Sequence, residues 1–386
     1  MQLVEVTNKH LADDFLMVNV LINKDTPNYI RPLDNDINDI FNEKKNKTFR
    51  SGKVKRWLLK DDKTNYIGRI AAFTNKRYKN KGDDVPVGGV GFFDCINDHA
   101  AAAMLFDVSK KWLAEQGVEA MDGPINFGER DRWWGLVIEG FHEPLYGMNF
   151  NPPYYQSLFE TYGFKRFFGQ VCLGMNPKQK LSDKLFARHA LFANDAAFKV
   201  VNIEKKRLEK FAEDFATVYN AAWAGHGGLK QLKKAQVIQM FNKMKPVMDE
   251  RIIWFTYHGE KPIAIFVNLP DLNQWFKYLN GQFNLIHKLK FLWIKKTKPC
   301  KKFTGLVFGI VPEFQGKGID AYMVVEAYKT VLKNPYTEYE MQWIGDFNPR
   351  MLNVAKGLGD VFQSRLLVTY RYLFDRNKEF KAHPVL

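Results

Sequence analysis

The sequence has few of the features that mark secreted, metal-binding or membrane-spanning proteins. Its 386 residues include three cysteines, Cys95, Cys172 and Cys300, without a C-x-x-C pair or a metal-ligand spacing, so we expect neither a disulfide framework nor a metal site. No apolar run approaches the ~20 residues that span a bilayer. The amino-terminal residues lack the basic and then apolar pattern of a secretory signal. We therefore expect a cytoplasmic protein with no membrane span.

Acidic residues are also scarce relative to basic ones. There are 42 Asp and Glu against 57 Lys and Arg, which gives a formal net charge of +15. Part of this excess is local, because seven lysines between residues 287 and 302 interleave with Phe291, Leu292 and Trp293. Such a segment fits a nucleic-acid or acidic-membrane patch, a surface that attracts a polyanionic nucleotide cofactor, or a solvated loop. The seven are Lys288, Lys290, Lys295, Lys296, Lys298, Lys301 and Lys302.

Residues 303–333 predict a buried strand, a glycine loop and an amphipathic helix. The apolar run 306–311 predicts a strand that Pro312 ends, because proline cannot donate to a sheet ladder. Apolar residues spaced by three and four predict a helix that begins near Ile319. Gly316 and Gly318 lie between them, where glycine lets backbone N–H groups converge and the helix dipole adds positive potential. The segment therefore predicts an anion-binding loop.

The spacing of the glycines in this loop indicates which class of anion it binds. It matches neither the G-x-G-x-x-G of a dinucleotide-binding loop nor the G-x-x-x-x-G-K-[ST] of a P-loop. Residues 315–320, Gln-Gly-Lys-Gly-Ile-Asp, resemble the Q/R-x-x-G-x-G/A signature of the GNAT acyltransferase superfamily. Gln315 and Gly318 match that signature, whereas Asp320 stands where glycine or alanine is usual. An ordinary glycine turn capped by Asp320 is the other interpretation.

The resemblance implies that acetyl-CoA, or another acyl-CoA, binds with its pyrophosphate at this loop. The strand before the loop would supply a backbone N–H to the thioester carbonyl. The same resemblance implies that Asn348, at the start of a later predicted helix, also belongs to the cofactor-binding residues. The implied cofactor-binding residues are Phe308, Gly309, Ile310, Val311, Gln315, Gly316, Lys317, Gly318, Ile319, Asp320 and Asn348.

The chain also predicts a repeat of architecture. A Phe-Asn-Pro triplet precedes a short helix and a strand at residues 150–173 and again at 347–374. Upstream of each lie two helices, a strand pair and a third strand followed by a helix, which is the order of the GNAT superfamily. We expect an α/β (α+β) fold of two tandem GNAT-like domains, each a mixed, mostly antiparallel sheet flanked by helices. The predicted divisions are an N-terminal domain at 1–178 without the loop signature, a connecting segment at 179–199, and a C-terminal domain at 200–386 with the CoA-binding loop.

The resemblance further implies a base for the acceptor amine and a tyrosine that protonates the departing thiolate. Glu340, Asp346 and His226 are candidate bases, although Glu340 alternates with apolar residues and fits a solvent-facing position equally well. No tyrosine lies just after Asn348, so Tyr370, with Tyr372 beside it, is the candidate acid.

A block in the first half resembles a group of bacterial tandem GNAT proteins with G-P-x-N-F, E-G-F and N-P-P-Y-Y segments. Its aromatic and polar residues fit a pocket for an organic substrate, and core packing explains the aromatic ones equally well. Adjacent tryptophans cannot both point inward on a strand, which favours a pocket or a domain interface for that pair. The candidate pocket residues are Asn126, Trp133, Trp134, Glu139 and Tyr154.

These interpretations predict an acyl-CoA-dependent N-acyltransferase with its active site in the C-terminal domain and a small-molecule or peptide amine as acceptor. Two alternatives stay open. One is an aminoacyl-tRNA-dependent transferase built from paired GNAT folds, with nucleic acid as the partner. The other is a non-catalytic protein that binds CoA or another ligand. The sequence leaves the acceptor and the oligomeric state undetermined.

Overall fold

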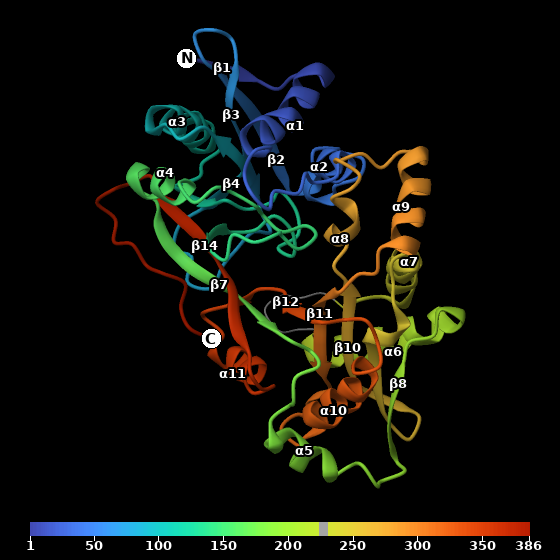
Figure 1. The fold of residues 1–386 in the computed structure, drawn as a ribbon. Helices are drawn as coiled ribbons and strands as arrows, with labels where there is room; N and C mark the ends of the chain where they lie inside the picture. Colours follow the sequence, from blue (N-terminus) through green and yellow to red (C-terminus); the bar gives the residue numbers. More distant parts are fainter. Residues whose placement is uncertain (224–230) are drawn as a thin grey trace.

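The computed structural model describes residues 1–223 and 231–386. In this part of the chain, one sheet runs through the whole molecule, with helices on its faces (Figure 1). Its strand order is β1-β2-β3-β4-β5-β14-β7-β12-β11-β10-β9-β8, with β6 beside β14 and β13 beside β7. Two neighbouring pairs, β4 with β5 and β11 with β12, are parallel, and the other pairs are antiparallel. The predicted mixed, mostly antiparallel sheet flanked by helices is confirmed.

The first half follows the predicted order of elements. Its elements are β1 (Gln2–Glu5), α1 (Lys9–Asn23), α2 (Asp34–Ile40), β2 (Gly52–Lys60), β3 (Tyr66–Asn75), β4 (Val87–Cys95), α3 (His99–Glu115), β5 (Ala120–Gly123), β6 (Leu136–Glu139), α4 (Tyr155–Tyr162) and β7 (Lys165–Met175).

The second half repeats this order and adds one helix, α5, before its first strand and two, α8 and α9, between its second and third long strands. Its elements are α5 (Asp183–Ala190), β8 (Phe198–Asn202), α6 (Leu208–Trp223), α7 (Lys234–Met244), β9 (Ile253–His258), β10 (Lys261–Pro270), α8 (Asn273–Phe276), α9 (Leu285–Thr297), β11 (Lys302–Ile310), α10 (Ile319–Val331), β12 (Glu338–Met341), β13 (Ile344–Gly345), α11 (Pro349–Lys356) and β14 (Phe362–Leu373).

The two halves exchange their last strands. Strand β7, which ends the first half, pairs with β12 and β13 of the second half. Strand β14, which ends the second half, pairs with β5 and β6 of the first half and lies against β7 along most of its length. The predicted boundaries at residues 178 and 200 remain a prediction, because the sheet is continuous across them.

Local sequence explains how the elements around the loop begin and end. Pro349 is the first residue of α11, and the side chain of Asn348 accepts a hydrogen bond from the Met351 N–H, which caps the helix. The apolar face of α10 is buried against the sheet, with Ala321, Met323 and Val325 fully covered. Within the described residues, no helix is both long and apolar enough to cross a membrane.

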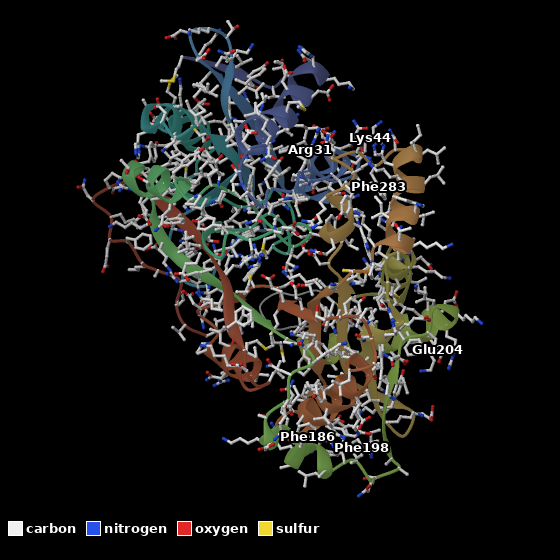
Figure 2. The ribbon with its side chains drawn as sticks, viewed as in Figure 1. Arg31, Lys44, Phe186, Phe198, Glu204 and Phe283 are labelled. Atoms are coloured by element: carbon white, nitrogen blue, oxygen red, sulfur yellow. The ribbon has the colours of Figure 1, made fainter. Side chains whose placement is uncertain are left out.

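The connecting segment lies against the second half. Phe186 of α5 packs on Tyr328 of α10, and Phe198 of β8 packs on Phe192 (Figure 2). These aromatic contacts hold α5 and the residues that follow it against the second half.

Candidate functional site

The parallel strands β11 and β12 separate partway along their length. They pair from Lys302 and Glu338 as far as Gly305 and Met341, and β11 then continues against β10 to Ile310. A cavity of about 190 Å³ lies where the two strands part. Its lining is mostly apolar and comes from β10, β11, α10, β12, β13, α11 and the residues that follow α11. The lining residues with large apolar side chains are Phe266, Leu306, Val307, Phe308, Val324, Met341, Trp343, Ile344, Met351, Val354 and Leu358.

The backbone of β11 directs donors toward this gap. The Val311 N–H donates to the Ile263 carbonyl on the β10 side at 2.9 Å. Alternation along a strand therefore turns the N–H groups of Phe308 and Ile310 toward the opposite edge, where β12 has already ended. The Gln315 side chain donates to the Ile310 carbonyl at 2.9 Å, so this residue ties the loop to the end of the strand.

The glycine loop has the backbone that an anion-binding turn requires. Gly316 and Gly318 have φ angles of 72° and 102°, in the left-handed region where glycine is favoured. Gly318 is the N-cap of α10, and among the described residues no acceptor is found for the N–H groups of Gly316, Gly318 or Ile319. Lys317 is exposed beside them. The loop thus offers unpaired donors at a helix amino terminus, which is the chemistry that a pyrophosphate needs.

The acidic residue that departs from the signature is neutralised by a partner from the connecting segment. Arg188 of α5 donates to Asp320 at 2.9 Å. The side chains of Arg188 and Phe192 also lie within 4 Å of the position that a Cβ atom on Gly318 would occupy. A guanidinium beside the loop offsets the repulsion that a carboxylate would otherwise exert on a phosphate. The spacing of the sequence does not reveal Arg188, because the motif lies more than a hundred residues away.

A tyrosine and an asparagine meet at the point where β11 and β12 part. The Tyr339 hydroxyl lies within 3.0 Å of the position that a Cβ atom on Gly305 would occupy, so a side chain there would displace this hydroxyl. The Oδ1 atom of Asn268 lies against the same position, is buried, and has no hydrogen-bond partner among the described residues. Burial raises the pKa of Tyr339, so its hydroxyl keeps its proton at neutral pH. Side chains alternate between the two faces of a strand, so Tyr339 lies on the opposite face of β12 from Glu340. This alternation could have identified Tyr339 as a candidate from the sequence.

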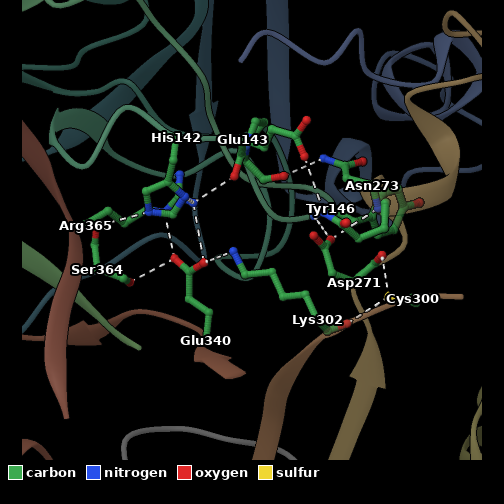
Figure 3. A network of polar contacts seen from close by, with 12 residues as sticks. His142, Glu143, Tyr146, Asp271, Asn273, Cys300, Lys302, Glu340, Ser364 and Arg365 are labelled. Atoms are coloured by element: carbon green, nitrogen blue, oxygen red, sulfur yellow. Dashed lines mark hydrogen bonds and ion pairs between the residues drawn. The ribbon is translucent and has the colours of Figure 1, made fainter. Parts of the chain in front are cut away.

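Glu340, a predicted catalytic base, lies in a buried ion-pair network (Figure 3). Its carboxylate accepts hydrogen bonds from Arg365 at 2.8 Å and Ser364 at 3.0 Å and forms an ion pair with Lys302 at 2.7 Å. Burial by itself raises the pKa of this carboxyl, but Arg365 and Lys302 outweigh burial and lower the pKa to about 2. Glu340 is 1% exposed, so the solvent-facing position is wrong. A carboxylate held this strongly is a weak base.

The same network joins the two halves of the chain (Figure 3). Arg365 donates to Nδ1 of His142 at 2.8 Å, so Nε2 of that imidazole carries the proton and donates to the Ser364 carbonyl at 3.1 Å. Burial, and then the charge of Arg365, lowers the pKa of His142. Nearby, burial raises the pKa of Asp271 to about 6, while its Oδ1 accepts the Tyr146 N–H at 3.2 Å. Sequence reasoning missed this junction, because its members are far apart in the chain.

The other predicted catalytic residues that the structure describes do not line the cavity. Asp346 accepts hydrogen bonds from the Gly169 N–H at 2.8 Å and from Arg166 at 2.9 Å, which ties it to β7. Tyr370 and Tyr372 lie in the core of the first half, where Tyr370 donates to Glu160 at 2.8 Å. His226 lies outside the described residues. The catalytic roles of all four stay predictions.

The candidate substrate pocket of the first half is largely core. Trp133 and Trp134 are both buried, because this stretch is not a strand and Trp133 has a φ angle of 44°. Trp133 lines a cavity of about 60 Å³, which is too small for an organic substrate. The other three candidates are engaged elsewhere. Asn126 donates to the Glu129 carbonyl, Tyr154 donates to the Cys95 carbonyl, and Glu139 accepts from Gln363.

The first half also lacks a donor-rich loop at the equivalent place. The side chain of Asp98 accepts the Ala101 N–H at 2.9 Å and caps α3. A carboxylate that already occupies the helix amino terminus leaves little room for a second anion there.

Comparison with solved structures shows which fold this order of elements forms. A tandem GNAT protein from the clavulanic acid biosynthesis pathway has a TM-score of 0.53 over 98% of this chain and all of that one, at 10% identity. A GCN5-related N-acetyltransferase from Sphaerobacter thermophilus has a TM-score of 0.50 over 98% of both chains, at 9% identity. The chain also spans 38% of a fungal multi-domain β-N-acetylglucosaminidase that has a GCN5-related glucosamine N-acetyltransferase region, with a TM-score of 0.53 and 12% identity. The chain has the tandem GNAT fold.

Two curated proteins are similar to this chain over most of its length. One is a bacterial ceramide synthase from Caulobacter vibrioides, 22% identical over 350 residues that cover 89% of this chain and 90% of that protein. The other is protein YghO from Escherichia coli, 25% identical over 365 residues that cover 91% and 90%. No protein-family model matches the sequence.

Proposed function

We propose that this protein is an acyl-CoA-dependent N-acyltransferase whose acyl donor binds to the second half. The observation that carries the proposal is the unpaired donor loop at residues 316–319 beside the cavity between β11 and β12. The unpaired N–H groups of the loop suit a nucleotide pyrophosphate, and the mostly apolar gap suits the acyl chain of a thioester. The tandem GNAT fold of the chain supports the same reaction class.

We further propose that the acyl group is a long hydrocarbon chain. The lining of the cavity is mostly apolar, and Tyr339 is the only ionisable side chain that lines it among the described residues. An apolar cavity of this kind favours a hydrocarbon over a polar group. One curated relative is a ceramide synthase, a name that denotes joining a fatty acyl chain to the amine of a lipid base. A lipid amine is therefore our proposed acceptor for this chain.

Five groups of the chain have proposed roles in the reaction. An acyl-CoA supplies an activated thioester when it is bound. The N–H groups of Phe308 and Ile310 lie on the edge of β11 that faces the gap, where they would stabilise negative charge on the carbonyl oxygen. The Tyr339 hydroxyl lies where β11 and β12 part and is our candidate acid for the departing thiolate, because it is the ionisable group that lines the gap among the described residues. Arg188 and Lys317 would bind phosphate oxygens beside the loop.

Thermal stability with added ligand tests the donor. Palmitoyl-CoA at about 100 times its dissociation constant should stabilise the wild type by about 2.7 kcal/mol. Gly316→Glu should abolish this effect, because it places a carboxylate in the loop. Gly117→Glu is the matched control, since Gly117 has a similar φ angle of 77° and, like Gly316, open space around it. If no acyl-CoA stabilises the wild type, the proposal is wrong.

A second pair of variants tests the acyl chain. Leu306 lines the cavity and is 42% exposed, whereas Leu332 at the end of α10 is 44% exposed and does not line it. Leu306→Trp should weaken the binding of palmitoyl-CoA much more than that of acetyl-CoA, and Leu332→Trp should change neither. Equal effects of Leu306→Trp on both ligands would show that the chain does not enter the cavity.

A further inference from the structure

Helix α9 lies outside the plan that the two halves share. In the first half, β3 and β4 are joined by residues 76–86, which contain no helix. In the second half, the equivalent connection between β10 and β11 runs over residues 271–301 and contains α8 and α9. Helix α9 lies at the outer edge of the molecule (Figure 1). An addition at this place is not needed to complete the sheet.

One face of α9 holds the helix to the body of the protein. Phe291 and Ile294 are buried, and Phe291 packs on Trp275 and Phe276 of the α8 segment. Phe283 lies between α8 and α9 (Figure 2), with its ring against both Phe276 and Phe291. These aromatic contacts fix which side of α9 faces outward.

The outward face of α9 is a row of large apolar side chains. Residues 285, 289 and 292 repeat at intervals of four and three, and residues 286 and 293 lie next to them, so the five share one side of the helix. All five are well exposed, at 55% to 74%, whereas large exposed apolar residues elsewhere in the described chain are mostly scattered. The row comprises Leu285, Ile286, Leu289, Leu292 and Trp293.

The surroundings of this row are strongly basic. Residues 272–302 contain eight lysines and no aspartate or glutamate. Lys288, Lys290 and Lys296 are exposed and form no ion pair with any described residue. On the helix they fall at the margins of the apolar row or at its carboxyl-terminal end. Their long side chains can keep the ammonium groups at a polar boundary while the leucines enter an apolar phase.

We propose that α9 docks this protein on the surface of an anionic lipid bilayer, with the helix axis in the plane of the membrane. The leucines and Trp293 would enter the boundary between headgroups and acyl chains, and the lysines would meet the lipid phosphates. The helix has 13 residues, which is too short to span the bilayer. The proposal does not rest on the proposed function, although it would bring a lipid acceptor close to the protein.

The charge of the α9 surface argues for a bilayer over a second copy of the chain. Two copies joined through α9 would place two lysine-rich segments without acidic residues against each other, and their repulsion would oppose association. An anionic bilayer offers both partners that the surface needs, a negative layer for the lysines and an apolar layer for the row.

Vesicle flotation of the full chain tests this proposal. The wild type should bind vesicles that contain phosphatidylglycerol and bind pure phosphatidylcholine weakly, with binding that falls as salt is raised. Leu289→Glu with Trp293→Glu should reduce the partition coefficient about tenfold or more. Leu191→Glu, at a position that is 71% exposed and directly follows α5, should leave it unchanged. Circular dichroism should show that the variants stay folded, because both substituted α9 side chains point to solvent.

The role of the lysines is tested by replacing Lys288, Lys290 and Lys296 with Glu. This triple substitution reverses their charge and should remove the preference for anionic vesicles. The proposal is overturned if the wild type does not bind anionic vesicles, or if the α9 variants bind as well as it does. It is also overturned if the Leu289→Glu with Trp293→Glu variant turns a dimer into a monomer in size-exclusion chromatography without changing vesicle binding.

Discussion

At the scale of single residues, the charge state of Glu340 governs the junction between the halves. The pKa of its carboxyl is about 2 in the folded protein and 4.5 for a free side chain, so folding favours the charged form. The stability that this charge contributes, about 3 kcal/mol, is therefore fully present above pH 4.5 and is lost as the pH falls toward 2. Urea unfolding between pH 2 and 7 should show this loss in the wild type.

Two substitutions on β12 separate this effect from general acid sensitivity. Glu340→Gln should lower the free energy of unfolding at pH 7 by about 3 kcal/mol, because Arg365 loses its buried partner. It should also reduce the change in the free energy of unfolding as the pH falls from 4.5 toward 2. Glu338→Gln, at an exposed position of the same strand, should show the same change in the free energy of unfolding with pH as the wild type. If the free energy of unfolding changes with pH in the same way for the wild type and Glu340→Gln, the charge of Glu340 does not cause the loss of stability in acid.

Tyr339 is the residue on which the proposed chemistry depends most directly. Tyr339→Phe removes the hydroxyl and leaves the ring in its stack on Phe303. We expect kcat to fall by about 100-fold, in the range of general acid catalysis, with little change in the affinity for acyl-CoA. Steady-state kinetics and ligand-induced stabilisation measure the two effects separately. An unchanged kcat would remove Tyr339 from the reaction.

At the scale of elements, β14 is the strand that most strongly couples the halves. It lies between β5 or β6 of the first half on one side and β7 on the other. Val368→Pro in its middle removes a ladder hydrogen bond in a central strand and should cost about 3 kcal/mol or more. Val4→Pro in the edge strand β1 should cost less, because β1 has one neighbour.

Limited proteolysis distinguishes global from local damage in the β14 variant. Because both halves pair with exchanged strands, Val368→Pro should make both halves susceptible to cleavage. A first half that stays resistant while the second is degraded would show that β14 is not shared in the way the pairing indicates.

At the scale of the whole molecule, the continuous sheet predicts cooperative unfolding. The strands β7 and β14 pair with each other and with the opposite half, so neither half keeps a complete sheet when the other unfolds. Scanning calorimetry should give one transition whose calorimetric and van't Hoff enthalpies agree. Two separated transitions would mean that each half keeps its own stability.

The sequence by itself determined the order of elements that the two halves share and the glycine loop, because these depend on local patterns, but it did not predict α8 and α9. Apolar spacing, proline after a strand and glycine before a helix act over a few residues, and the structure places α10, α11 and β11 where those patterns predict. The tandem GNAT fold followed from the same order. The sequence also contained the lysines of 287–302, but not the information that they surround an exposed apolar row.

Only the tertiary structure decided which distant groups meet. The pairing of Arg188 with Asp320, the burial of Glu340 between Arg365 and Lys302, and the exchange of β7 and β14 all join segments far apart in the chain. Periodicity shows that one face of an element is apolar, but it does not say what that face will contact. Long-range contacts depend on how the helices and strands pack in space, and that packing satisfies buried charges and strand edges that local sequence leaves open.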